Sequence, residues 1–277
     1  MVDMESEESN MPRVLIIAGS DSSGGAGIQA DLKTVTALGG YGMTAITAIT
    51  AQNTCGVSDI HAVPVASVRS QIEVTLLDMG ADVIKTGMLA TREVIETVAE
   101  TVAELAGTVP CVIDPVMVAT SGDTLLADNA TGALKSLLIE GAHLVTPNAP
   151  EAQLLTGKPV EDVNGQRRAA EALLEAGALA ALVKGGHVEG AVITDVLQTQ
   201  YGEHIFEAPR IASTQTHGTG CTLASAIATL IGQGKELPDA VYAGREYLFG
   251  AIKAAPGFGK GTGPVNHGWK IAKRNDV

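Results

Sequence analysis

The stretch VLIIA-GSDSSGGAG-IQADLKTVTAL, residues 14–38, joins three kinds of local sequence. Residues 14–18 are a short continuous apolar run, residues 19–27 are a glycine-rich loop, and residues 28–38 have the apolar spacing of a helix. A strand, a glycine loop and a helix in this order predict the first unit of a parallel sheet that helices bury on both faces. The loop matches neither a Walker A nor a GxGxxG sequence, so by itself it also fits a turn that only permits close packing. The stretch therefore predicts an α/β fold, and leaves the ligand open.

The rest of the chain repeats this alternation. Short apolar runs predict strands at residues 43–50, 82–85, 109–114, 143–145 and 180–183, followed by a hairpin of residues 192–197 and 204–208. Periodic segments predict helices at residues 68–79, 92–106, 129–138, 164–176, 223–232 and 238–253. Because no repeat or long linker interrupts this series, we expect one domain, residues 12–277. We expect residues 1–11 to form a disordered acidic tail.

The composition excludes several classes of function. The chain of 277 residues carries 31 acidic against 18 basic residues, a net charge of −13, and only 3% aromatic residues. This balance argues against nucleic acid as a partner. No apolar run approaches the length of a membrane span, and the acidic N-terminus is unlike a signal peptide. Three widely spaced cysteines indicate neither a disulfide framework nor a zinc site, so the sequence predicts a cytoplasmic protein.

Side chains that suit ligand binding follow one predicted strand after another. Because the carboxyl ends of parallel strands meet at one edge of a sheet, we expect these side chains to face one cleft. They are Asp31, Gln52, Met88, Asp114, Glu151, Lys184 and Cys221.

Each candidate also fits a purely structural role. The alternatives are a solvated helix acid for Asp31, a turn cap for Gln52, a core side chain for Met88, an exposed loop lysine for Lys184, and a helix cap formed by Asn148 with Glu151. Their joint position is therefore a stronger argument than any one of them.

The segment THGTGCT, residues 216–222, is the most informative of the candidate segments, and it leads into a predicted helix. Its two glycines precede a helical pattern, so backbone N–H groups converge there and form an anion hole. A thiol at such a helix N-terminus tends to have a lowered pKa, so Cys221 is a candidate proton acceptor for phosphoryl transfer to a hydroxyl. Simple capping with an inert buried cysteine remains an alternative, as does an acyl-transfer pair of His217 with Cys221.

The motifs in their order resemble those of one enzyme family. They are AGSD (18–21), SGGAGIQADLK (23–33), AQNT (51–54), KTGML (85–89), DPVM (114–117), TPNAPE (146–151), KGGH (184–187), THGTGCT (216–222) and GPV (263–265). Together they closely resemble the hydroxymethylpyrimidine/phosphomethylpyrimidine kinases of thiamine biosynthesis, over residues 13–269.

The resemblance implies a ribokinase-like fold, a three-layer α/β/α sandwich with a central, mostly parallel sheet. It implies ATP-dependent phosphorylation of 4-amino-5-hydroxymethyl-2-methylpyrimidine, and then of its monophosphate to the pyrophosphate. ATP and Mg²⁺ are the implied cofactors, and a homodimer is the implied assembly.

The resemblance also implies roles for individual residues. Cys221 is the base or positioning group for the acceptor hydroxyl, Lys184 contacts the phosphates, and Gly218 and Gly220 supply the anion hole. The remaining roles are hydrogen bonds to the aminopyrimidine from Asp31 and Gln52, packing on its ring by Met88, Val116 and Ala26, nucleotide contacts from Thr219 and Asn148, and service of the Mg²⁺ region by Asp114 and Glu151. Many relatives have lysine where this chain has Thr120, which puts a phosphate contact from that position in doubt.

Two rival functions follow from the same motifs. A pyridoxal or pyridoxine kinase binds a comparable hydroxymethyl ring at a cysteine-bearing site, although Gln52 and Asp31 suit an aminopyrimidine better. A catalytically inactive pyrimidine-binding regulator is the more remote alternative, since the Gly218, Gly220 and Cys221 set is intact.

Overall fold

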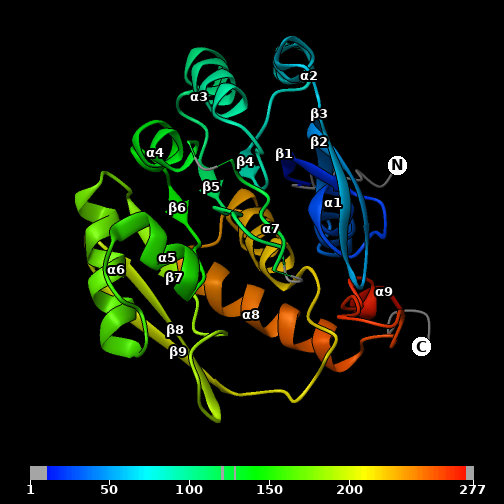
Figure 1. The fold of residues 1–277 in the computed structure, drawn as a ribbon. Coiled ribbons are helices and arrows are strands. Elements are labelled where there is room, and N and C mark those ends of the chain that lie inside the picture. Colours follow the sequence, from blue (N-terminus) through cyan, green and yellow to red (C-terminus); the bar gives the residue numbers. More distant parts are fainter. Residues whose placement is uncertain (1–10, 120–121, 128, 273–277) are drawn as a thin grey trace, which may run out of the picture.

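The computed structural model describes residues 11–119, 122–127 and 129–272. Residues 1–10 of the expected tail, and Thr120, lie outside these ranges. The described residues form a nine-stranded sheet in the order β3-β2-β1-β4-β5-β6-β7-β8-β9 (Figure 1). The strands are β1 (Arg13–Asp21), β2 (Tyr41–Asn53), β3 (Gly56–Ala62), β4 (Val83–Thr86), β5 (Cys111–Ile113), β6 (Leu144–Val145), β7 (Ala180–Val183), β8 (Val192–Thr199) and β9 (Gly202–Pro209).

The middle of this sheet is parallel and its margins are antiparallel. Strands β2, β1, β4, β5, β6 and β7 pair in parallel, whereas β3 pairs with β2, β8 with β7 and β9 with β8 in antiparallel register. The chain runs from β1 outward to β2 and then returns to β4 on the other side of β1. Such a reversal opens a crevice at the carboxyl ends of the strands, where open α/β sheets bind ligands.

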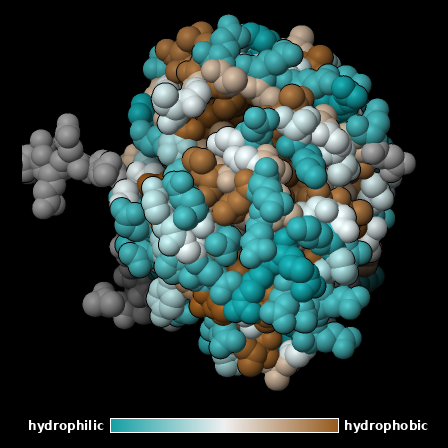
Figure 2. Space-filling model, turned by 90° about the vertical axis from the view of Figure 1, so that its left-hand side faces the viewer, coloured by the Kyte–Doolittle hydropathy of each residue, from teal (hydrophilic) through white to brown (hydrophobic). Residues whose placement is uncertain are grey.

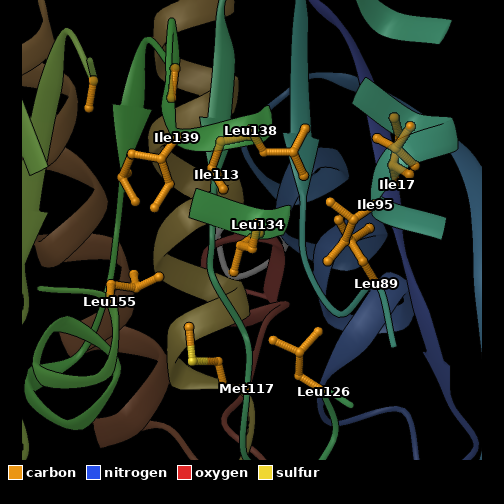
Figure 3. Close-up of a cluster of buried hydrophobic side chains, with 14 of the residues drawn as sticks. Ile17, Leu89, Ile95, Ile113, Met117, Leu126, Leu134, Leu138, Ile139 and Leu155 are labelled. Atoms are coloured by element: carbon orange, nitrogen blue, oxygen red, sulfur yellow. The ribbon is translucent and has the colours of Figure 1, made fainter. Parts of the chain in front are cut away.

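Helices cover both faces of the sheet. They are α1 (Gly27–Ala37), α2 (Val65–Asp78), α3 (Arg92–Ala106), α4 (Thr131–Leu134), the π-helix η1 (Lys135–Ile139), α5 (Ala149–Thr156), α6 (Val163–Glu175), α7 (Thr219–Gly232), α8 (Leu237–Lys253) and α9 (Trp269–Ala272). Alternate residues of the strands divide between two cores. One core packs against α2 to α6, and Figure 3 shows part of it, with side chains that converge from the sheet and from α3, α4, η1 and α5. The other packs against α1, α7 and α8. The predicted three-layer α/β/α sandwich with a mostly parallel sheet is confirmed.

Two differences from the sequence-based prediction have a clear physical reason. The edge strand β3 was not predicted, because its side chains are mainly exposed and carry no buried apolar run. The helix expected over residues 129–138 is instead the short α4 followed by η1. Apolar spacing indicates a helical segment without distinguishing a π turn from an α turn.

The face of the molecule in Figure 2 is mainly hydrophilic. Hydrophilic residues cover most of the face shown in Figure 2, with smaller hydrophobic areas between them. Within the described residues no helix is both long enough and apolar enough to cross a lipid bilayer.

Candidate active site

A cavity of about 750 Å³ lies at the carboxyl edge of the parallel strands. Its walls come from the ends of β1, β2, β5, β6 and β7, from the first turn of α7 and from one side of α8. Every site residue expected from the sequence lines it except Asp31. Those that line it are Ala26, Gln52, Met88, Asp114, Val116, Asn148, Glu151, Lys184, Gly218, Thr219, Gly220 and Cys221.

Backbone geometry requires glycine at the start of α7. Gly218 is the N-cap of this helix and has φ 80°, in the left-handed region that favours glycine. A Cβ atom at Gly218 would lie 1.8 Å from the carbonyl oxygen of Gly25, so the two loops touch backbone to backbone. The first N–H groups of a helix have no partner within the helix and carry its partial positive charge. This end of α7 therefore offers an anion-binding surface at the cavity wall.

A buried cation stands next to that helix end. The Nζ atom of Lys184 lies 3.1 Å from Oδ1 of Asp114, which also accepts a hydrogen bond of 3.1 Å from Thr146. Lys184 is 13% exposed in its side chain, and a Cβ atom at Gly220 would lie 3.3 Å from its Nζ. Burial lowers the pKa of Lys184, but the carboxylates of Asp114 and Glu151 outweigh it, so the net pKa is raised. The ammonium group is thus held charged beside the anion-binding surface.

Asn148 and Glu151 form a capping box at the N-terminus of α5. The Asn148 side chain accepts from the N–H of Glu151 at 2.9 Å, and the Glu151 carboxylate accepts from the N–H of Asn148 at 2.8 Å. The helix cap that the sequence offered as an alternative is present, and both residues also line the cavity. Burial, together with the Asp114 carboxylate, raises the pKa of Glu151 to about 7, although Lys184 opposes this change.

The other end of the cavity is apolar with one amide group. Met88 is 7% exposed, and its backbone carbonyl accepts from the hydroxyl of Thr47 at 2.6 Å. Gln52 accepts at Oε1 from the Thr50 hydroxyl at 3.2 Å, and within the described residues its Nε2 donates to no protein group. Met88, Val116 and Gln52 all line this part of the cavity, and apolar walls with a single amide group are typical of small-molecule sites.

The structure places Asp31 behind the cavity wall. Its side chain is fully buried and accepts hydrogen bonds of 2.9 and 3.0 Å from Lys85 and of 2.7 Å from Ser225. A carboxylate with these partners has no face toward a ligand. The direct contact between Asp31 and a bound ring that the sequence suggested has no support in this geometry.

The expected lowering of the Cys221 pKa is wrong. Burial raises the pKa of this thiol to about 12, although the Lys85 ammonium group and the N–H of Gly27 act in the opposite direction. The carboxylates of Asp31 and Asp114 add to the rise. Desolvation of the anionic form therefore outweighs the helix dipole, and the thiol is protonated at neutral pH.

Two pairs of ionisable side chains in the site were not identified from the sequence. His217 Nε2 lies 2.8 Å from Oδ2 of Asp21, which also accepts from the N–H groups of Gly25 and Ala26 at 3.0 and 2.8 Å. This contact ties the loop after β1 to the loop before α7. The GSD triplet at the end of β1 was a possible signal, but its partner is 196 residues away.

The second pair is Arg245 with Asp195, and both residues line the cavity. Arg245 on α8 donates from Nε to Asp195 at 2.7 Å, and Asp195 accepts from the N–H of Gly185 at 2.7 Å. Both ionic side chains are less than 10% exposed. They hold the backbone next to Lys184 in place.

Sequence comparison identifies relatives along nearly the whole chain. The family described as phosphomethylpyrimidine kinase matches residues 21–266. The hydroxymethylpyrimidine/phosphomethylpyrimidine kinase of Streptomyces coelicolor is 49% identical over 263 residues, which cover 95% of this chain and 96% of that protein.

Solved structures of two kinds of kinase are similar to this one. An ADP complex of Bacillus subtilis pyridoxal kinase has a TM-score of 0.86 at 35% identity, covering 93% of this chain and 97% of that one. A phosphomethylpyrimidine kinase from Clostridium difficile has a TM-score of 0.78 at 39% identity, covering 87% of this chain and 99% of that one.

Proposed function

The chain belongs to the phosphomethylpyrimidine kinase family, and from this membership we infer that its cavity transfers a phosphoryl group from ATP to hydroxymethylpyrimidine and then to the monophosphate. The protein is a hydroxymethylpyrimidine/phosphomethylpyrimidine kinase of thiamine biosynthesis. The observation that carries this function is the 49% identity to a kinase of that name along almost its entire length. The site supports it, because one cavity holds a buried cation, a helix N-terminus, two carboxylates and a ring-sized apolar end.

We assign the phosphate contacts to the start of α7 and to Lys184. Phosphoryl transfer needs in-line positioning and charge stabilisation more than covalent help from the protein. The backbone N–H groups at Gly218 to Gly220 can hold the transferred group, and the Lys184 ammonium group neutralises its charge. The acceptor oxygen bonds to the phosphorus as the bond to ADP breaks, ADP keeps that electron pair, and the hydroxyl proton is released.

Asp114 and Glu151 are the residues proposed to hold Mg²⁺. The described residues contain no cluster of three or more metal-ligating side chains, but Mg²⁺ commonly takes only one or two carboxylates together with phosphate oxygens and waters. Within those residues, Oδ2 of Asp114 is buried without a hydrogen-bond partner, so the donor set fits. When bound, the ion supplies charge neutralisation for the phosphates.

Cys221 is proposed to orient the acceptor hydroxyl at the junction between the ring pocket and the phosphate site. With a pKa of about 12, the thiol is a neutral hydrogen-bonding group in the free enzyme. We propose Gln52 as the partner of the ring edge, and Met88, Val116 and Ala26 as the walls that contact its faces. Thr219 and Asn148 are proposed nucleotide contacts.

Phosphorylation of pyridoxal is the second candidate activity. The observation in its favour is the similarity of the fold to pyridoxal kinase, with a TM-score of 0.86. The higher sequence identity to the pyrimidine kinases makes pyridoxal the lesser substrate.

A coupled ADP-release assay tests the proposed function. It compares hydroxymethylpyrimidine, its monophosphate and pyridoxal at equal concentrations with saturating ATP and Mg²⁺. We expect the highest kcat/KM for the two pyrimidines. A higher kcat/KM for pyridoxal would reverse the assignment, and tight pyrimidine binding without turnover of any substrate would indicate a regulator.

Assembly and location are proposed from family likeness alone. We propose a homodimer that works in the cytoplasm. Light scattering on the purified full chain measures the first, and fractionation of cells that express it measures the second.

A further inference from the structure

Two helices meet directly beneath the Cys221 sulfur. Helix α1 presents Gly27 and Asp31 one turn apart, and helix α7 presents Cys221 and Ser225 with the same spacing. In the upper layer, the N–H of Gly27 opposes the rise in the pKa of the Cys221 thiol. In the lower layer, the Ser225 hydroxyl donates to Oδ1 of Asp31 at 2.7 Å. A hydrogen bond therefore joins the two helices one turn away from Cys221.

Strand β4 inserts a charge into the lower layer. Lys85 reaches Asp31 with Nζ at 2.9 and 3.0 Å, and both side chains have no exposed surface. Burial alone would lower the pKa of Lys85, but Asp31 and other anionic groups outweigh it, so the net pKa is raised and the ammonium group stays charged. The proposed mechanism uses neither member of this pair.

Packing alone does not account for an ion pair at this depth. Removing two charges from water costs more than their attraction often returns, and apolar side chains of similar volume commonly stabilise a fold as well or better. A helix-strand-helix junction could be filled by such side chains. We therefore expect the charge of Lys85 to act on a neighbouring group.

The charge of Lys85 acts on the Cys221 thiol, which the proposed mechanism uses to orient the acceptor hydroxyl. Four charged groups act on it from separate elements: Lys85 on β4, Asp31 on α1, Asp114 after β5 and Lys184 after β7. The two carboxylates disfavour negative charge at the sulfur, and the two ammonium groups favour it. Lys184 pairs with Asp114, whereas Lys85 pairs with Asp31, which Ser225 joins to α7 one turn after Cys221.

We propose that Lys85 is a positioning residue for phosphoryl transfer, which with Asp31 and Ser225 fixes the Cys221 sulfur at the junction of α1 and α7 and keeps a positive charge beside it. This inference rests on the proposed function, because the sulfur matters to catalysis only as the group that faces the acceptor hydroxyl. The charge beside the sulfur offsets the two carboxylates where the acceptor oxygen develops negative charge.

The test uses the reactivity of the Cys221 thiol, which needs no kinase substrate. In a Cys55→Ser background, which removes the exposed cysteine, iodoacetamide labelling of the peptide containing Cys221 is followed by mass spectrometry from pH 7 to 9. We expect Lys85→Met to slow this labelling about 10-fold at each pH, the effect of one pKa unit. We expect kcat for hydroxymethylpyrimidine to fall by a similar factor, while the KM for ATP changes less than about twofold.

The control removes a buried hydroxyl from the same helix and leaves the side chains of Lys85, Asp31 and Ser225 in place. Thr229 lies one turn beyond Ser225 and donates to the Ser225 carbonyl at 2.7 Å. We expect Thr229→Val to leave both the labelling rate and kcat unchanged, because it removes a buried hydroxyl but no charge.

The assays distinguish three outcomes. They are a variant that misfolds, a proposed function that is wrong, and a Lys85 role that is wrong. If Lys85→Met does not fold, the double variant Asp31→Asn with Lys85→Met removes both charges and enters the same assays. A folded variant with wild-type labelling and wild-type kcat would overturn the inference. A wild-type protein that phosphorylates neither pyrimidine would instead overturn the proposed function, whatever the labelling rates are.

Discussion

Replacing Gly218 with alanine tests the tightest contact in the site. The new Cβ atom would lie 1.8 Å from the Gly25 carbonyl oxygen, whereas a close C···O contact is about 3.3 to 3.6 Å. One loop must therefore move by roughly 1.5 Å. The residue must also keep φ near 80°, which costs a side-chain-bearing residue about 1–2 kcal/mol.

Neither loop can move without losing other contacts. The N–H of Gly25 donates to Asp21 at 3.0 Å, and Asp21 holds His217, the neighbour of Gly218. Since a shift of about 1 Å in a reacting group costs on the order of 10²-fold in rate, we expect Gly218→Ala to lower kcat by about that factor. Steady-state ADP release with hydroxymethylpyrimidine measures it.

Gly234 provides the matched control at the other end of α7. Its φ is 81°, and a Cβ atom there would meet no atom within 4 Å. We expect Gly234→Ala to lose about 1 kcal/mol of unfolding free energy in urea titrations, with kcat unchanged. A Gly218→Ala protein with kcat within about threefold of wild type would refute the assignment of this loop to the phosphate site.

Three further predictions concern the site and its surroundings. Cys221→Ala should lower kcat by about 10²-fold in the same assay, and Cys221→Ser should lower it less, because a hydroxyl can orient the acceptor in place of the thiol; near-normal turnover of the alanine variant would exclude the role. Burial lowers the pKa of His267 to about 4, so between pH 6.5 and 4 the unfolded chain binds more protons than the folded one, and stability falls as pH falls. Urea titrations should show a loss of about 2 kcal/mol from pH 7 to 5 through this group, and His267→Gln should remove that share; equal slopes in both proteins would contradict it. Arg245→Met should cost about 3 kcal/mol in urea titrations because it leaves the buried Asp195 carboxylate unpaired, and adding Asp195→Asn should recover part of this loss; a larger loss in the double variant would show that the two residues do not act as a pair.

Local sequence was sufficient for most of the architecture. Helix α3 and strand β7 have the bounds that the apolar pattern predicts, because each buries one periodic face or a continuous apolar run. The pattern failed at β3, which buries almost nothing, and at η1, where the same apolar positions suit a wider turn. Apolar spacing therefore predicts only those helices and strands that bury a regular set of apolar side chains.

The candidate site was also visible in the sequence, although the state of its groups was not. Lys184, Asp114 and Gly218 each follow or precede a predicted element, so the topology alone brings them to one edge. The pKa of Cys221 was misjudged because the helix dipole can be inferred from the sequence, whereas desolvation requires knowledge of the neighbours.

The sequence by itself determined the α/β/α sandwich, the sheet edge at which the candidate site lies and the resemblance to the pyrimidine kinases, which the family membership confirms. These follow from short-range patterns and from the order of motifs. Only the tertiary structure decided which ionisable side chains pair. Asp31 meets Lys85 across 54 residues, and Asp21 meets His217 across 196. Pairing energies and pKa values depend on burial and on distances of a few ångströms between side chains, and no local pattern in the chain encodes either.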